Sequence, residues 1–398
     1  MYNPETGKVE FEDHETKKLD TYDYHERLSF KGRWATPDQN FEFIVHFYPY
    51  NNSVEIYDLT HGRTFMKRLR TNVRHHDLFL GNKLSIYNRH IKLISFANDF
   101  TRNNIVEMRS LCILKPILKC HQYGPILKVL EKQDLRIAKL TMCVISRKDA
   151  LQFYHYLRGR AICPFMVEHL ASGASLGIEM VGQDAVSRLY SILGPRTPAE
   201  GRKVAPHTLR AIYGHDRIVN ALHGSVRRDL VENELNIFFP EKQLPPTTTA
   251  VYENSTLCIV KTHILKDRRL GELITYIGES HFKITAMDSF YLTMTDAEEF
   301  QSRKIVPDFM KYVEPFMDGY CVAIEISGRV PDMNVCDELR KFLGPKDPVV
   351  AREIVPYSLR ARFGIDRYKN ACYGSDSNTE AQYELEFFFK ILRRNLHW

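Results

Sequence analysis

Apolar and polar residues alternate from residue 28 to about residue 101, which is the spacing of strands with one buried face. Phe41, Phe43, Val45 and Phe47 stand two positions apart, and short turn sequences rich in Gly, Asn and Pro separate this run from the next. The pattern predicts a small, mostly β module built from antiparallel hairpins.

The pattern changes after residue 108, where strand-like runs alternate with segments of helical period. Asp184 and the pair Gly194-Pro195 mark the start and the end of one predicted helix. This order predicts an α+β domain with helices on one face of an antiparallel sheet. The predicted strands are 111–114, 137–145 and 176–181, and the predicted helices are 124–133, 147–158 and 184–193.

The same blocks occur twice in the chain. LCILKP at 111–116 recurs as LCIVKT at 257–262, and Leu193, Arg210 and Asn220 have counterparts 150 positions later. This period is far beyond the ~20 to 50 residues of a solenoid unit, so each copy is predicted to be a whole domain. The predicted order is a polar tail (1–25), the β module (26–108), a first domain (109–240), a linker rich in proline and threonine (241–253) and a second domain (254–398).

Composition narrows the class of protein. The chain has no apolar run of the ~18 residues that a membrane span needs and no basic-then-apolar amino terminus, so we expect an intracellular protein without a membrane partner. Its 8 cysteines lack the paired spacing of zinc sites, which favours buried free thiols and predicts no bound metal. The formal charge of +6 is small and the basic residues are spread along the chain, so nucleic acid is not an expected partner.

One chemical difference separates the two copies. The first carries Asn220-Ala-Leu-His223-Gly-Ser, and the second carries Asn370-Ala-Cys-Tyr373-Gly-Ser. Imidazole is a competent nucleophile near neutral pH, whereas a phenol of pKa ~10 is a poor one without a nearby base. The sequence therefore predicts that only the first copy keeps a nucleophile at this position.

In order and spacing, these blocks resemble the nucleoside diphosphate kinase family across both copies, about two thirds of the chain. The resemblance implies tandem ferredoxin-like domains, with His223 storing a phosphoryl group between two nucleotides and Glu234 fixing its tautomer. It also implies ATP or other nucleoside triphosphates as substrates and Mg²⁺ as the ion that bridges their phosphates. The nucleotide-binding residues implied for the first copy are Lys115, Tyr154, Arg196, Arg210 and Asn220.

Both copies depart from the family pattern. In the first, Ile162 stands where the family has the phenylalanine that stacks on the base, so we expect weakened nucleotide binding, with Arg196 compensating in part. The retained charges of the second copy are as consistent with a regulatory nucleotide site as with a purely structural role. This degenerate second site comprises Lys261, Arg340, Arg360, Asn370 and Tyr373.

The β module is similar to the DM-ten module of axonemal proteins through its RTFMKRL and LFLGNKLSIYNR segments. Tandem members of the kinase family that carry such a module are found with ciliary and microtubule structures. The resemblance implies a protein of the ciliary axoneme and the cytoplasm, with tubulin and other doublet-microtubule proteins as partners. Two functions stay open: a structural component of doublet microtubules with residual phosphotransfer, and an active nucleoside diphosphate kinase working near them.

Overall fold

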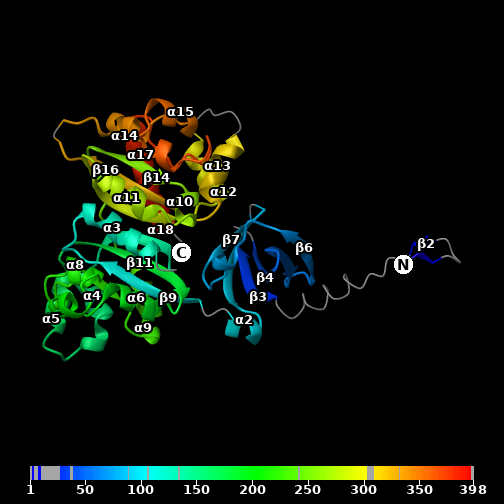
Figure 1. The fold of residues 1–398 in the computed structure, drawn as a ribbon, viewed down its shortest axis with the longest axis horizontal. Helices are drawn as coiled ribbons and strands as arrows, with labels where there is room; N and C mark the ends of the chain where they lie inside the picture. The colour runs from blue at the N-terminus through cyan, green and yellow to red at the C-terminus, as the bar shows by residue number, and fades with distance from the viewer. Residues whose placement is uncertain are drawn as a thin grey trace. The chain divides into compact units, whose positions relative to one another are not determined.

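A computed structural model describes residues 2–3, 8–9, 27–35, 39–87, 89–104, 107–132, 135–240, 243–302, 309–330 and 332–395. The predicted polar tail lies outside the described residues, apart from the strands β1 (Tyr2–Asn3) and β2 (Lys8–Val9). The chain divides into two compact units, Met1–Val106 and Glu107–Trp398 (Figure 1). Each unit has its own buried apolar core.

The first unit contains a six-stranded antiparallel sheet. Its elements are β3 (Leu28–Ala35), β4 (Asn40–Tyr48), β5 (Ser53–Asp58), β6 (Arg63–Arg70), the 3-10 turn η1 (His75–Asp77), β7 (Lys83–Ile86), β8 (Arg89–Phe96) and the helix α2 (Asp99–Asn104). The strand order is β6-β5-β4-β3-β8-β7. Phe43, Val45 and Phe47 are fully buried, because every second side chain of a strand faces the same side.

The second unit contains a ferredoxin-like sheet in each copy. Its strands are β9 (Glu107–Leu114), β10 (Arg136–Val144), β11 (Ala174–Gln183), β12 (Leu222–Gly224), β13 (Thr247–Thr248), β14 (Ser255–Val260), β15 (Phe282–Phe290), β16 (Cys321–Gly328) and β17 (Cys372–Gly374). The strand order is β12-β9-β11-β10 in the first copy and β17-β14-β16-β15 in the second. Both orders place the fourth strand beside the first and the third beside the second, which confirms the predicted α+β fold.

Helices connect these strands. Those of the first copy are α3 (Cys120–Glu131), α4 (Arg147–Phe153), the 3-10 turn η2 (His155–Leu157), α5 (Cys163–Ala171), α6 (Ala185–Leu193), α7 (Pro198–Val204), α8 (Leu209–Tyr213) and α9 (Arg228–Phe238). Those of the second copy are α10 (Thr262–Lys266), α11 (Leu270–Gly278), α12 (Met294–Gln301), α13 (Phe309–Met317), α14 (Val335–Leu343), α15 (Pro348–Ile354), α16 (Leu359–Phe363), α17 (Asn378–Glu386), the π-helical η3 (Phe387–Leu392) and α18 (Arg393–Asn395).

Several predicted helix ends need correction. The helix predicted over 124–133 spans Cys120–Glu131. The helix predicted over 147–158 ends at Phe153, and a 3-10 turn follows it. The prediction that Asp184 caps α6 is wrong, because this residue has a left-handed backbone (φ 53°) and its side chain makes no capping hydrogen bond. Gly194 ends the helix as predicted, with a φ of 79° that glycine adopts without strain.

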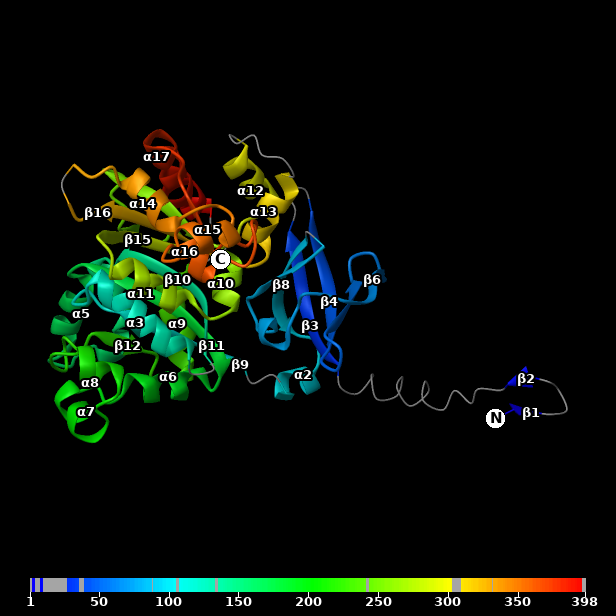
Figure 2. The same ribbon diagram turned by 45° about the horizontal axis from the view of Figure 1, so that its top comes forward.

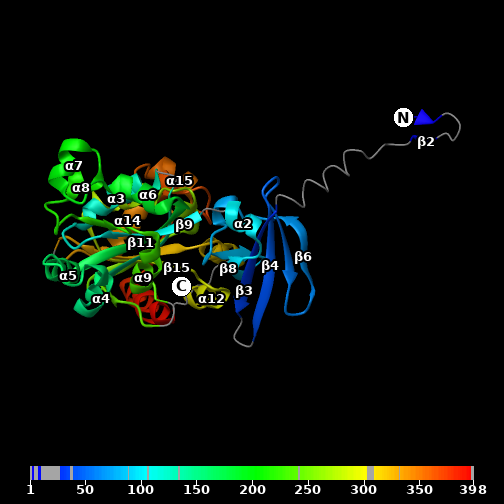
Figure 3. The same ribbon diagram turned by 90° about the horizontal axis from the view of Figure 1, so that it is seen from below.

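Helices cover both faces of the sheet in the second unit, not one face as predicted (Figures 2 and 3). The strand residues explain this arrangement: Cys112 and Leu114 of β9 belong to one core, whereas Leu111 and Ile113 belong to the other. Because both faces are apolar, both must be covered. In Figure 3, α3 and α6 lie on one side of the sheet and α9 and α12 on the other.

The two copies join edge to edge through β10 and β15, which form one continuous sheet. The strands pair at Thr141 and Asp288. Side chains extend this contact: the Ser289 hydroxyl accepts a hydrogen bond from the backbone N–H of Leu140 at 2.9 Å, and the Asp288 carboxylate accepts one from the backbone N–H of Met142 at 3.0 Å. One chain therefore holds two copies of a domain as an internal pair.

Helices α3 and α11 cross at two glycines, one from each copy. A Cβ at Gly124 would lie 2.2 Å from the backbone nitrogen of Thr275, and a Cβ at Gly271 would lie 2.1 Å from the backbone nitrogen of Lys128. At the same crossing, the Glu131 carboxylate accepts a hydrogen bond from the backbone N–H of Gly271 at 2.8 Å. The missing side chains let the two backbones come this close.

Two expectations from composition bear on the described part of the chain. No helix there combines the length and the hydropathy that crossing a bilayer requires. All 8 cysteines lie within the described residues and are free, and all but Cys120 are buried, as predicted.

Candidate functional site

Lys115 lies at the centre of a buried site in the first copy. It follows β9, and its backbone N–H donates to the carbonyl oxygen of Ala221 at 2.9 Å. The side chain is 1% exposed, and its Nζ donates to Oδ1 of Asn220 at 3.0 Å. Burial, together with the nearby charge of Arg210, lowers the pKa of Lys115 to about 7. Because the amide is neutral, it does not compensate the charge of Lys115, and the ammonium can still bind an anion.

Arg210 provides a second buried cation beside Lys115. It extends from α8, where Nε donates to the carbonyl oxygen of Leu222 at 3.0 Å and one terminal nitrogen donates to that of Gly194 at 2.7 Å. Burial lowers the pKa of Arg210 to about 10, so the guanidinium stays charged at neutral pH. The backbone carbonyls hold its planar group in place without neutralising it.

The backbone that carries Asn220 and His223 is strained at Ala221. This residue has a left-handed φ of 63°, and Ala371 has one of 70° at the equivalent position of the second copy. Alanine adopts this region at a cost of about 1 kcal/mol or more, so the surrounding packing must hold it there. The turn leads directly into β12, where His223 pairs with Ile113 of β9.

His223 faces a buried carboxylate. Its Nε2 lies 3.4 Å from Oε1 of Glu234, and neither atom has a hydrogen-bond partner in the described part of the chain. Burial lowers the pKa of His223 although the Glu234 charge opposes the shift, so the ring is neutral at pH 7. Because Glu234 faces Nε2, Nδ1 is the nitrogen left for chemistry.

Two residues that the sequence analysis did not single out complete this arrangement. The Ser225 hydroxyl donates to Oε2 of Glu234 at 2.6 Å and accepts from the backbone N–H of Leu111 at 3.0 Å, which fixes the carboxylate. The Phe153 ring lies edge-on to His223, with a centroid distance of 4.9 Å. The sequence could have indicated Ser225, because this serine belongs to the repeated Asn-x-x-x-Gly-Ser block.

The other predicted residues of the first site lie around this set. Tyr154 is fully buried, its ring centroid is 6.5 Å from that of His223, and burial raises the pKa of its unpartnered hydroxyl. Arg196 is exposed, so it does not belong to the buried set. Its charge still lowers the pKa of Arg210, which places it within electrostatic range of the site.

The second copy keeps the residue types but not the contacts. Nζ of Lys261 donates to the carbonyl oxygen of Tyr368 at 2.6 Å, and Nδ2 of Asn370 donates to that of Lys346 at 2.9 Å. The lysine–amide bond of the first copy is therefore replaced by two backbone contacts. Arg360 retains its place, with Nε donating to the carbonyl oxygen of Cys372 at 3.2 Å.

Tyr373 fills the histidine position of the second copy. Its hydroxyl donates to Oε1 of Glu384, and its ring packs edge-on against Phe300 at a centroid distance of 5.2 Å. Burial and the Glu384 charge raise the pKa of this phenol well above its usual value. The exposed Arg340 on α14 donates to the carbonyl oxygen of Asp376 at 3.2 Å and stays at the rim.

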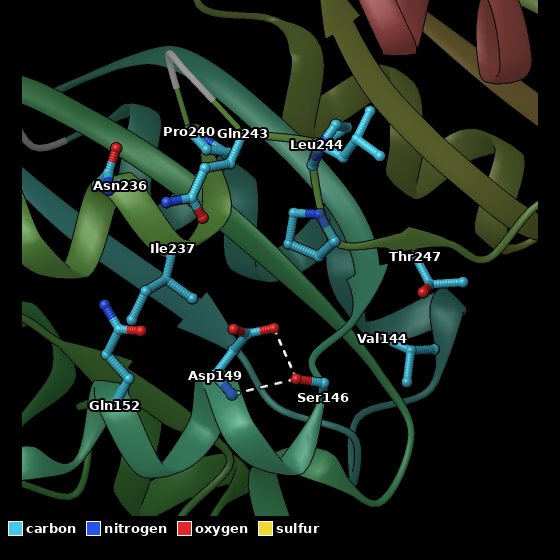
Figure 4. Close-up of a pocket in the computed structure, with 12 residues that line it drawn as sticks. Val144, Ser146, Asp149, Gln152, Asn236, Ile237, Pro240, Gln243, Leu244 and Thr247 are labelled. Carbon is cyan, nitrogen blue, oxygen red and sulfur yellow. Dashed lines mark hydrogen bonds between the residues drawn. The ribbon is translucent and has the colours of Figure 1, made fainter.

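A separate pocket of about 200 Å³ lies where the linker passes α4 and α9 (Figure 4). Ser146 and Asp149 form a helix cap at its floor, with the hydroxyl donating to Oδ2 at 2.6 Å. Asn236, Gln243 and Thr247 face the same space. It contains none of the residues around His223, and its groups already bond one another or are neutral, so we assign it no chemistry.

Comparisons with known proteins agree with the repeated architecture. The family model "Nucleoside diphosphate kinase" matches residues 108–244 and 254–393. Nucleoside diphosphate kinase homolog 7 from Rattus norvegicus is 32% identical over 375 residues, 92% of this chain and 94% of the relative. The Mus musculus homolog 7 matches with the same identity and shares. Among solved structures, the nucleoside diphosphate kinase of Aquifex aeolicus matches at 32% identity with a TM-score of 0.31, covering 32% of this chain and 92% of that one.

Proposed function

The chain belongs to the nucleoside diphosphate kinase family, and we propose that its first domain transfers the terminal phosphoryl group of nucleoside triphosphates through His223. The observation that carries this proposal is a neutral, buried imidazole with a carboxylate on one nitrogen and two buried cations nearby. The second domain lacks the imidazole and would not transfer.

The reaction has two halves that share one nitrogen. In the first, Nδ1 of His223 attacks the γ-phosphorus, the bond from phosphorus to the bridging oxygen breaks, and a nucleoside diphosphate leaves. In the second, a terminal oxygen of another diphosphate attacks the same phosphorus and the N–P bond breaks. Glu234, held by Ser225, would stabilise the positive charge that the ring acquires in between.

Lys115 and Arg210 would bind the phosphate oxygens, where negative charge is spread in the transition state. Asn220, which accepts from Lys115, would orient the ammonium and contact the nucleotide. Members of this family use Mg²⁺ with nucleotides. The described residues contain no group of three His, Cys, Asp or Glu side chains that could hold a metal ion. Mg²⁺ bound with the nucleotide would supply positive charge that offsets the charge of the phosphates.

Phosphate transfer can be tested with γ-labelled ATP and Mg²⁺ on the purified full chain. We expect acid-labile label on the protein that passes to added GDP, and loss of both signals in His223→Ala. The matched control is His207→Ala, which removes an exposed histidine of the same domain and should label normally. Equal labelling of the native chain and His223→Ala would contradict the proposal, whereas ATP binding without any label would leave a nucleotide-binding domain that does not transfer.

A second role, as a component of ciliary doublet microtubules with tubulin and axonemal proteins as partners, is also proposed. Its support is the DM-ten-like module ahead of the tandem and the loss of the nucleophile from a second domain whose core stays fully packed. A fold can be retained as a binding block after its site has decayed.

This role predicts that assembly does not depend on chemistry. Tagged chain carrying His223→Ala should enter the axoneme of ciliated cells as the native chain does, whereas a chain without residues 27–104 should fail to do so. Exclusion of the His223→Ala chain, or its dispersal through the cytoplasm, would count against a structural role and favour a working enzyme near microtubules.

A further inference from the structure

The edge strand β6 carries cations that the proposed function does not use. Residues 63–74 hold five lysines and arginines and no acidic residue. β6 is the last strand of the sheet, and no other strand in the described residues pairs with its outer edge. Arg63, Lys67 and Arg70 are exposed, and their side chains bond to no residue that the structure describes.

Arg68 differs from these three cations. Its guanidinium lies 3.8 Å from the ring centroid of Tyr48, and Nε donates to the hydroxyl of Ser53 at 2.8 Å. Residues of β4 and β5 therefore hold Arg68 within the sheet. Arg63, Lys67 and Arg70 make no comparable contact with the part of the unit that the structure describes.

The same edge presents apolar side chains. Leu69 is 48% exposed, and Tyr57 on the neighbouring β5 is 37% exposed opposite Thr64. Phe65 packs against the core of the unit. An incoming strand would therefore meet three kinds of group at once: backbone N–H and C=O groups, cations and apolar surface.

We propose that β6 is a docking edge for an extended segment of a partner protein in which acidic residues predominate, with apolar residues between them. Such a segment adds a strand to the sheet through backbone hydrogen bonds. Arg63 pairs with Asp58 and Arg70 pairs with Ser53, which lie on opposite faces of β5, so acidic side chains on both faces of the added strand would meet cations. Cations on an edge strand also protect it from self-pairing, because the β6 strands of two copies repel each other. The same charges select an acidic partner.

The test is fluorescence anisotropy of the full chain with a labelled peptide of three Glu-Glu-Val repeats, which carries acidic side chains on both faces when extended. Three ion pairs at a sheet edge contribute about 0.2–1 kcal/mol each, so reversing two of them with Lys67→Glu and Arg70→Glu should weaken binding about tenfold or more. The matched control reverses two exposed cations of the same unit away from this edge, Lys31→Glu and Arg102→Glu, and should bind nearly as the native chain does.

Backbone pairing is tested on the peptide, so it does not depend on the folding of a variant. Only every second amide of an added strand faces β6. Methylating those amides should abolish binding, whereas methylating the alternate amides should leave binding unchanged. Equal loss in both charge-reversed chains, or equal binding of both methylated peptides, would reduce the interaction to diffuse attraction and overturn the proposal.

Two further outcomes would also overturn it. Binding that appears only after removal of residues 1–26, which contain eight acidic residues, would assign the edge to the chain's own segment. Tighter binding of a single-stranded oligonucleotide, lost in the edge variant, would assign it to nucleic acid. The open strand edge favours a polypeptide, because only a polypeptide can extend the ladder of backbone hydrogen bonds.

Discussion

The side chain at the histidine position differs between the two buried sites: it is His223 in the first domain and Tyr373 in the second. The Tyr373 hydroxyl donates to Oε1 of the buried Glu384, and Ser375 donates to Oε2, so in the second domain the phenol supplies one of the donors that hold this carboxylate. Tyr373→Phe removes this donor and should lower the free energy of unfolding by about 1–3 kcal/mol. The control is Tyr357→Phe, the same change at a position that is 78% exposed, which should be nearly neutral. Equal midpoints for both variants in urea would show that Glu384 does not need the hydroxyl.

Lys115 predicts a pH dependence for nucleotide binding. Burial lowers its pKa to about 7, and phosphate should restore the charged form, so ATP binding at pH 8 should take up nearly one proton. Uptake should fall towards zero as the pH drops below 7, because the free lysine is then already charged. Calorimetry in buffers of different ionisation enthalpy measures this number.

Two substitutions assign the proton to Lys115. Lys261→Arg serves as the background, because burial also lowers the pKa of Lys261 to about 7. Adding Lys115→Arg keeps a positive charge that does not titrate in this range and should abolish uptake. Uptake that persists in the double variant would come from another group. In the protein without nucleotide, the pKa of Lys115 is about 7 when folded and about 10 when unfolded. Between these values the unfolded state binds more protons, so Lys115 makes the free energy of unfolding rise with pH up to about 10.

At the scale of single residues, the sequence could predict which side chains lie together but not which hydrogen bonds they form. The order of the repeated blocks was enough to single out Lys115, Asn220 and His223. It carried no information on the different contacts of Lys261 and Asn370, since both copies have the same residue types there. Phe153 was missed because a ring that packs on a histidine from another element leaves no spacing in the sequence.

At the scale of elements, the period of apolar residues and the turn signals predicted where the strands lie. The predicted helix ends differed from those in the structure. Residues 111–114 were predicted to be a buried strand, yet its continuous apolar run also meant that both of its faces are covered. The helix crossing of α3 and α11 had no sequence signal beyond two glycines in helical segments, because a close approach depends on a partner distant in the chain.

Gly271 tests that crossing. Its replacement by alanine would place a Cβ 2.1 Å from a backbone nitrogen of α3, which cannot be relieved by rotating a side chain. We expect Gly271→Ala to lose about 2–3 kcal/mol of stability or more, measured by chemical denaturation. The control is Gly173→Ala, whose Cβ would meet only the Pro116 side chain at 3.4 Å and should change stability little. Similar small losses for both would mean that the helices separate without cost.

For the whole molecule, the repeat predicted two equivalent domains but not their continuous sheet. The joining strands read like any other strands, and polar residues within them, Thr141, Asp288 and Ser289, were the hint of a special role. Thr141 and Asp288 become buried only when β10 meets β15, a contact between segments almost 150 residues apart. Periodicity within a strand cannot report which edge it will meet.

Arg393 connects this junction to the end of the chain. It is 3% exposed, its guanidinium donates to the Asp288 carboxylate and to the Thr141 hydroxyl, and it also donates to the carbonyl oxygen of Pro246 at 2.9 Å. Arg393→Met would leave Asp288 buried without its cation, at a cost of about 3–5 kcal/mol. The two domains should then separate more readily, with faster hydrogen exchange in β10 and β15 than elsewhere in the sheet.

The double variant decides whether the ion pair itself joins the domains. Asp288→Asn with Arg393→Met removes both charges, so it should recover part of the loss, because neither charge is then buried alone. Additive losses would mean that the two side chains act independently and that strand pairing and the glycine crossing hold the domains together. Recovery would mean that the ion pair between Asp288 and Arg393 couples the two domains. Because Arg393 lies in α18, the internal pair would then form fully only once this last helix has folded.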